Sequence, residues 1–130
     1  MPLSRALRAL WIWGPLVAYV ILIFYLSSLS TIPWAAGTPD YISHAVEYCG
    51  LAILVARALN DGLDRPVPPR RLATAFLLTI GCAGLDETWQ YFTPDRFADY
   101  RDVISDAAGS AIGLGTLHLT RGFLARVGVL

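Results

Sequence analysis

The sequence has few charged residues, and it has no lysine at all. Charged side chains make up 15% of its 130 residues, whereas soluble domains contain about 25%. Hydrophobic residues make up 55%, which favours a membrane protein over a soluble one. The formal net charge of zero excludes a strongly basic nucleic-acid-binding protein, so no nucleic-acid partner is expected.

Cysteine is also scarce, and the sequence contains no internal repeat or low-complexity tract. Cys49 and Cys82 fall in apolar runs, and they match neither a disulfide framework nor a metal-ligand spacing. A chain of 130 residues is predicted to form one domain, residues 1–130.

Four long apolar segments are present, and a membrane-spanning helix needs about 20 such residues. They predict helices at about residues 10–29, 41–59, 72–92 and 102–120. The first segment carries no charge, and because Arg5 and Arg8 precede it, a cleaved signal peptide is the alternative to a retained helix. The predicted fold is all-α, a multi-pass bundle of four transmembrane helices.

The charged residues divide unequally between the two sides of such a bundle. Eight arginines and two aspartates would lie on the side that holds both termini and the loop between the second and third helices. The opposite side would hold the other two arginines and eight acidic residues. Because arginine-rich segments stay in the cytoplasm, both termini are predicted to be cytoplasmic and the acidic side to face outward.

Polar side chains occur near the outward end of every predicted helix. Most are three or four positions apart and therefore share helix faces: His44, Glu47 and Tyr48; Asp86 and Gln90; Asp102 and Asp106; with Ser27 and Ser28 ending the first helix. An ionisable group that faces lipid costs about 2.5–3.5 kcal/mol at the helix centre. These faces are therefore predicted to turn toward one another around an outward-opening pocket.

The catalytic candidates in this pocket are His44, Glu47, Asp86 and Glu87. The ligand-binding candidates are the other polar residues: Ser27, Ser28, Tyr48, Gln90, Arg96, Asp102 and Asp106. Arg96 is expected to pair with Asp102 or Asp86, and His44 is expected to serve chemistry rather than packing. Acid–base catalysis, divalent-cation binding and recognition of a polar headgroup or amine all fit these residue types. No cofactor is expected, and a divalent metal is the alternative.

Three stretches resemble the VanZ-like family of membrane proteins: FYLSSLS, HAVEYCGL and DETWQYFTPDRFADYRDVISDAAGSAIG. The family pattern is D-E-x-x-Q-x-F-x-P-G-R, then an aspartate six residues later and a G-x-x-x-G helix. Arg96, Asp102, Gly109 and Gly113 occupy the corresponding positions here, and Asp95 stands where a glycine is usual.

The resemblance implies a small integral protein of the bacterial cell membrane, in a family associated with resistance to the glycopeptide antibiotic teicoplanin. Three functions stay open. The pocket could bind or shield a cell-envelope lipid headgroup or cell-wall precursor. It could instead be a membrane-embedded acid–base or metal-assisted enzyme that acts on a lipid-linked envelope substrate. As a third alternative, the protein could be a structural or partner subunit. Membrane lipids or lipid-linked precursors are the expected partners.

Overall fold

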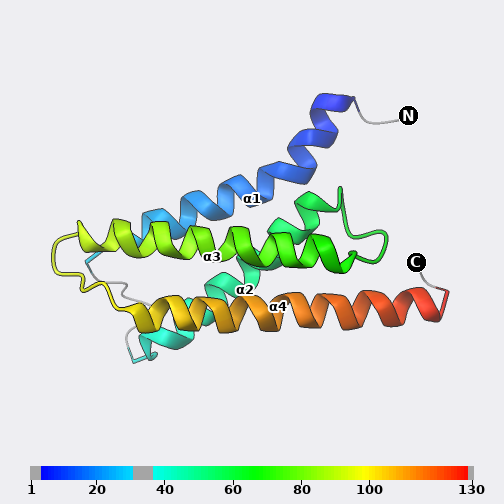
Figure 1. Ribbon diagram of the computed structural model, residues 1–130. Helices are drawn as coiled ribbons and strands as arrows, with labels where there is room; N and C mark the ends of the chain where they lie inside the picture. Colours follow the sequence, from blue (N-terminus) through cyan, green and yellow to red (C-terminus); the bar gives the residue numbers. More distant parts are fainter. Residues whose placement is uncertain (1–3, 31–36, 129–130) are drawn as a thin grey trace.

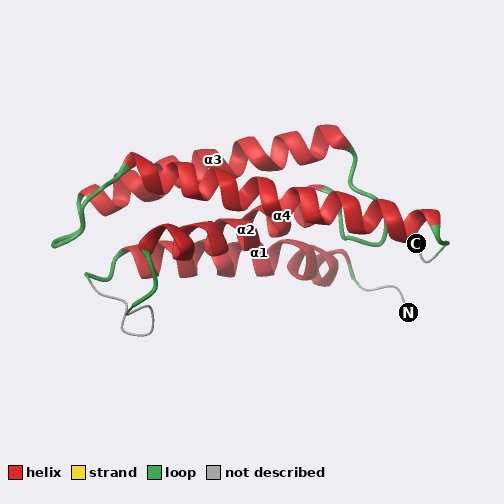
Figure 2. Cartoon of the chain, turned by 90° about the horizontal axis from the view of Figure 1, so that it is seen from below, coloured by secondary structure: helices red, strands yellow, loops and turns green. Residues whose placement is uncertain are grey.

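The computed structural model describes residues 4–30 and 37–128, and these residues form four α-helices and no strand. The helices are α1 (Arg5–Ser27), α2 (Asp40–Leu59), α3 (Pro69–Tyr91) and α4 (Tyr100–Arg126) (Figure 1). They lie side by side along one long axis (Figure 2). The predicted all-α architecture is therefore confirmed for this part of the chain.

α1 and α4 extend furthest beyond the apolar segments that predicted them. α1 begins at Arg5 rather than at residue 10, because the side chain of Ser4 accepts a backbone N–H of the first turn and caps the helix. α4 follows the capping residue Asp99 and continues to Arg126 rather than ending at 120. Hydropathy marks the part of a helix that is apolar, whereas capping side chains set where the helix begins.

The side chain of Asn60 holds the connection between α2 and α3 together by hydrogen bonds, and it is fully buried. Its amide nitrogen donates to the carbonyls of Gly62 at 3.1 Å and Arg65 at 3.2 Å, and its Oδ1 accepts from Arg71 at 2.6 Å. Gly62 has a φ of 118°, and its N–H returns to the carbonyl of Arg57 at 2.9 Å, which is how many helices end. These bonds fix the start of α3 beside the end of α2.

A proline inside α1 is matched by an arginine on α2. Pro15 has no N–H to donate to the carbonyl of Trp11, and Figure 1 shows α1 bending away from the bundle toward its N-terminus. Arg57 of α2 donates to the carbonyls of Trp11 and Ile12, each at 2.9 Å. The guanidinium therefore satisfies the backbone group that the proline leaves free and ties α1 to α2 at the bend.

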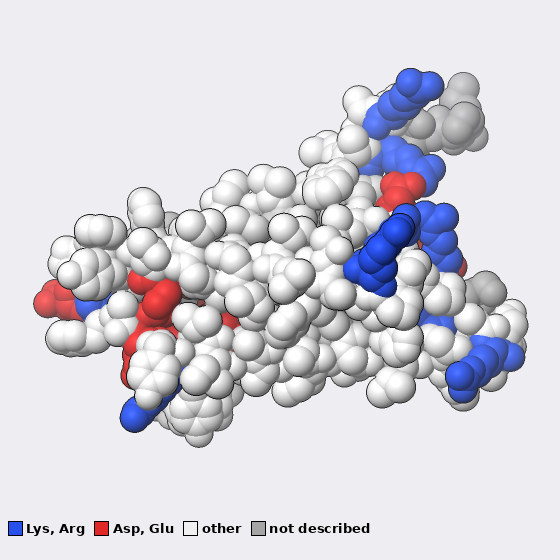
Figure 3. All heavy atoms as spheres, in the orientation of Figure 1, with Lys and Arg blue, Asp and Glu red and all other residues white. Residues whose placement is uncertain are grey.

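Charges gather at the two ends of the molecule. Both termini and the α2–α3 loop lie at one end, and the α3–α4 loop lies at the other (Figures 1 and 2). In Figure 3 most of the arginine groups lie at the end with the termini, most of the acidic groups lie at the opposite end, and the surface visible between them carries almost no charge. This arrangement matches the unequal division expected from the sequence.

Two of the helices, α1 and α2, are long and apolar enough to cross a membrane. α3 and α4 are also long, at 23 and 27 residues, and their outward surfaces are apolar. Leu77 on α3 is 70% exposed and Leu119 on α4 is 73% exposed, whereas Asp86 and Asp106 on the same helices are only 1% exposed. The bundle therefore has apolar groups outside and several charged groups inside.

Candidate functional site

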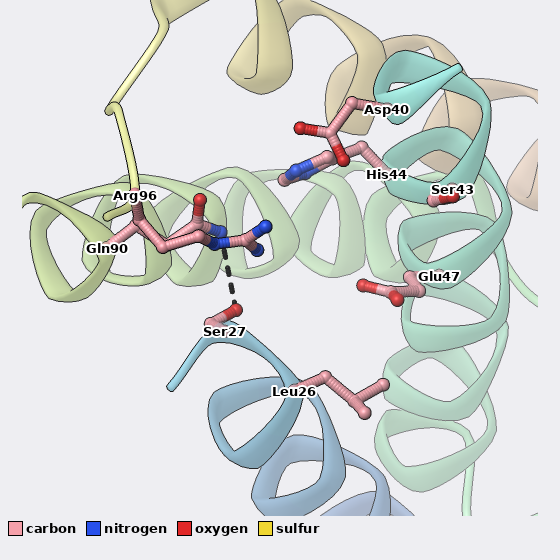
Figure 4. Close-up of a pocket in the computed structure, with 8 residues that line it drawn as sticks. All are labelled: Leu26, Ser27, Asp40, Ser43, His44, Glu47, Gln90 and Arg96. Carbon is pink, nitrogen blue, oxygen red and sulfur yellow. Dashed lines mark hydrogen bonds between the residues drawn. The ribbon is translucent and has the colours of Figure 1, made fainter. Parts of the chain in front are cut away.

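A small cavity lies at the end of the bundle that holds the α3–α4 loop. Residues from α1, α2, α3 and this loop line it: Leu26, Ser27, Asp40, Ser43, His44, Glu47, Gln90 and Arg96 (Figure 4). Its volume is about 10 Å³, which is room for about one water molecule. The cavity can therefore hold the tip of a polar group, but not a whole headgroup or peptide.

His44 lies between α2 and α4 and is only 4% exposed. Its Nδ1 is 3.0 Å from Oδ1 of Asp106, and its Nε2 is 3.8 Å from Oδ2 of Asp102. Both carboxylates face the same imidazole, because residues four apart lie on one side of a helix. The structure thus brings three of the predicted site residues together, and their chemical roles stay predictions.

Two glycines of α4 allow this close approach. A Cβ on Gly109 would overlap the backbone of Ala45, and one on Gly113 would lie 2.7 Å from the carbonyl oxygen of Cys49. α2 packs more extensively against α4 than any other pair of helices does. The G-x-x-x-G spacing therefore brings the two backbones into direct contact, as small residues do in membrane helices, and it places His44 against the α4 carboxylates.

The polar residues of α3 form a second group beside the first. Gln90 donates from its side-chain nitrogen to Oγ of Ser27 and to Oδ2 of Asp86, each at 3.3 Å. The other oxygen of Asp86 is buried and has no hydrogen-bond partner among the described residues. This oxygen is therefore a free hydrogen-bond acceptor on the α3 side of the cluster. Burying it without a partner costs folding free energy.

Arg96 enters the cavity from the α3–α4 loop. Figure 4 shows its guanidinium pointing between Ser27 and the face of α2 that carries Asp40 and Glu47. Within residues 4–30 and 37–128, Arg96 makes no ion pair, and its buried Nε has no hydrogen-bond partner. The predicted pairing of Arg96 with Asp102 or Asp86 is therefore wrong. His44 lies beside Asp102 instead, and Gln90 donates a hydrogen bond to Asp86.

Three other predicted site residues lie outside the cavity. Ser28 is exposed and accepts a hydrogen bond from the indole of Trp89 at 2.9 Å. Glu87 accepts the backbone N–H of Asp99, so it holds the α3–α4 loop against α3. Tyr48 is fully buried in the core. The structure therefore gives Ser28 and Glu87 structural contacts and places Tyr48 in the packing between helices.

The model of the VanZ/LLP1 family matches residues 10–121 of this chain. The chain belongs to this family. The match includes every residue of the cavity and of the His44 cluster, and it confirms the resemblance seen in the sequence motifs. No curated protein and no solved structure matches the chain.

The VanZ/LLP1 site includes two polar residues that the sequence analysis did not select. Asp40 and Ser43 both line the cavity. Asp40 begins α2 and is exposed, and it precedes His44 by four positions, so the same helix-face argument would have found it. One ligand atom each from Asp40, His44 and Asp102 lie within 4.8 Å of one another. This group has the donor types that bind divalent metals.

Proposed function

We propose that this VanZ/LLP1 protein is a multi-pass protein of the bacterial cell membrane, with four spans and both termini in the cytoplasm. The exposed apolar surfaces of α3 and α4 support four spans, although among the described helices only α1 and α2 are apolar enough in composition to count as candidate spans. The arginines at the end with the termini support this orientation. The acidic end and its cavity would then face outward.

Cysteine labelling in intact cells tests this topology. In a background where Cys49 and Cys82 are alanine, we expect Ala98→Cys to react with an impermeant maleimide and Asp64→Cys to react only after lysis. Both positions are exposed, Ala98 in the α3–α4 loop and Asp64 in the α2–α3 loop. Burial within the protein therefore does not explain a difference in labelling between them. Labelling of Asp64→Cys alone in intact cells would reverse the proposed orientation.

We further propose that the cavity binds the polar end of a cell-envelope lipid or of a lipid-linked cell-wall precursor. The observation that carries this proposal is the combination of one arginine with two acids around a cavity at the acidic end of the bundle. The buried Nε of Arg96 has no hydrogen-bond partner among the described residues, and a guanidinium suits phosphate oxygens. Asp40 and Glu47, on the opposite wall, suit an amine.

Binding of this kind would also fit the teicoplanin association of the family. A glycopeptide must reach its target at the outer surface of the membrane. A protein that holds the exposed end of a lipid-linked precursor would shield that target from the antibiotic. The small volume of the cavity, about 10 Å³, limits the bound part to a terminal group.

Retention of bound lipid tests the cavity. Arg96→Gln removes the guanidinium that lines the cavity, and a hydrogen bond to a charged group contributes about 1.5–3 kcal/mol. We therefore expect retained phospholipid or precursor to fall by about tenfold or more, measured by native mass spectrometry of protein extracted in mild detergent. Arg101→Gln is the matched control, because Arg101 is exposed. Equal retention by both variants would exclude the cavity as the lipid site.

A second candidate function is acid–base catalysis on the same lipid. The observation that favours it is the hydrogen bond between Nδ1 of His44 and Asp106 at 3.0 Å, because a carboxylate on one ring nitrogen orients the other for proton transfer. The mass of the lipid separates the two functions. An altered headgroup in cells that carry the protein, absent with His44→Gln, indicates catalysis, and an unchanged headgroup indicates binding.

A further inference from the structure

We propose that Asp40, His44 and Asp102 bind one divalent transition-metal ion at the wall of the cavity. All three ligands come from the protein, so binding of the ion does not require a lipid. Two ligands lie one turn apart on α2 and the third is on α4.

The first argument is the orientation of the imidazole. A neutral histidine has one N–H and one free lone pair. Nδ1 is 3.0 Å from the Asp106 carboxylate, so the proton belongs on Nδ1 and the lone pair of Nε2 is directed away from Asp106. Metal-binding histidines are held in this way by a carboxylate on the second nitrogen. Asp106 is 1% exposed, so its position is fixed by packing.

The second argument is the position of the two remaining carboxylates. Oδ2 of Asp102 is 3.8 Å from Nε2 of His44, and all three ligand atoms lie within 4.8 Å of one another. Ligand bonds of about 2.0–2.2 Å allow two ligands of one ion to be at most about 4.4 Å apart. Asp40 is exposed, so a small rotation of its side chain closes the remaining gap without disturbing the core.

The third argument is that the three protein ligands leave the coordination shell of the ion incomplete. Three protein ligands leave at least one coordination position for water or substrate, and Asp40 and His44 both line the cavity. The open position would therefore face the space where a polar ligand enters. One imidazole with two carboxylates suits Zn²⁺, Mn²⁺ or Fe²⁺ better than Mg²⁺ or Ca²⁺, which prefer oxygen ligands alone.

The competing explanation is that His44 is protonated and pairs with Asp102 and Asp106 without any metal. The two explanations differ at Asp40, which makes no ion pair with His44 within 4.0 Å in the described residues but belongs to the ligand group. Removing the charge of Asp40 would leave the ion pairs intact and would remove one metal ligand.

Titration with Zn²⁺ tests the site. The full chain, made without a polyhistidine tag, is stripped with chelator in detergent and titrated by calorimetry in excess Mg²⁺. We expect one Zn²⁺ per chain, with affinity reduced by about tenfold or more in Asp40→Asn, in His44→Ala and in Asp106→Asn. Asp40→Asn decides the test if the buried variants do not fold.

The matched controls are Asp95→Asn and His118→Ala, which remove an exposed acid and an exposed histidine outside the group. Both should bind Zn²⁺ as the unchanged protein does. Absence of stoichiometric binding, or equal losses in controls and test variants, would overturn the proposal. Arg96 lines the cavity but lies outside the ligand group, so unchanged Zn²⁺ binding by Arg96→Gln together with loss of lipid would separate the metal site from the lipid proposal.

Discussion

Gly109→Ala is expected to destabilise the bundle by about 3 kcal/mol or more. The added Cβ would overlap the backbone of Ala45, and a backbone cannot rotate away as a flexible side chain can. The α2–α4 contact is the most extensive in the molecule, so separating these helices loosens the whole bundle. Reversible unfolding in mixed micelles measures the change.

Gly115→Ala is the matched control on the same helix. Apart from the backbone of its own helix, no atom of the described residues lies within 4 Å of a Cβ at this position, and alanine is favoured over glycine inside a helix by about 1 kcal/mol. We expect this variant to be as stable as the unchanged protein or slightly more stable. Equal behaviour of Gly109→Ala and Gly115→Ala would mean that α2 and α4 do not meet at Gly109.

His44→Ala is also expected to be strongly destabilising, with a loss of about 3–5 kcal/mol. The sequence led us to expect a histidine placed for chemistry with little effect on stability, but the structure places it in the core. His44 is 4% exposed and Asp106 is 1% exposed, so removing the imidazole leaves a buried carboxylate without its partner. Thermal unfolding in detergent measures the loss.

A second substitution separates pairing from packing. Because Asp106→Asn removes the unpaired charge, His44→Ala combined with Asp106→Asn should recover much of the stability. His118→Ala, at an exposed position near the other end of α4, should change the free energy of unfolding by no more than about 0.5 kcal/mol. A His44→Ala protein as stable as His118→Ala would contradict the buried pair. Full recovery of both stability and lipid retention by the double variant would mean that the His44 cluster serves only to hold the helices together.

Hydropathy and charge predicted the number of helices and the separation of charge, since both are properties of whole segments. Helix ends were less predictable, because Ser4 and Asp99 set them through capping contacts. The left-handed turn after Pro94 was also uncertain from the sequence. Asp95 adopts a φ of 60° there, so an aspartate has the left-handed backbone conformation that glycine adopts most readily.

The sequence predicted the level of the site residues along the bundle axis, but not the directions in which their side chains point. Positions along the helices indicated that His44, Asp86 and Asp102 lie at one level of the bundle. They could not indicate how far each helix is rotated about its own axis, which decides that His44 faces α4. They also could not indicate how the α3–α4 loop folds, which decides that Arg96 points into the cavity. Partner choice therefore required the structure.

The contact of Gly109 with Ala45 also sets the position of the α4 carboxylates relative to His44. Asp102, Asp106, Gly109 and Gly113 follow one another along a single stripe of α4, and the glycines determine how far this helix can slide along α2. Slippage by one turn, about 5.4 Å, would carry the carboxylates past His44. The axial register of two helices thus decides which atoms meet at the cavity, so a methyl group added at Gly113, well below the cavity, should alter the surroundings of an imidazole that it never touches.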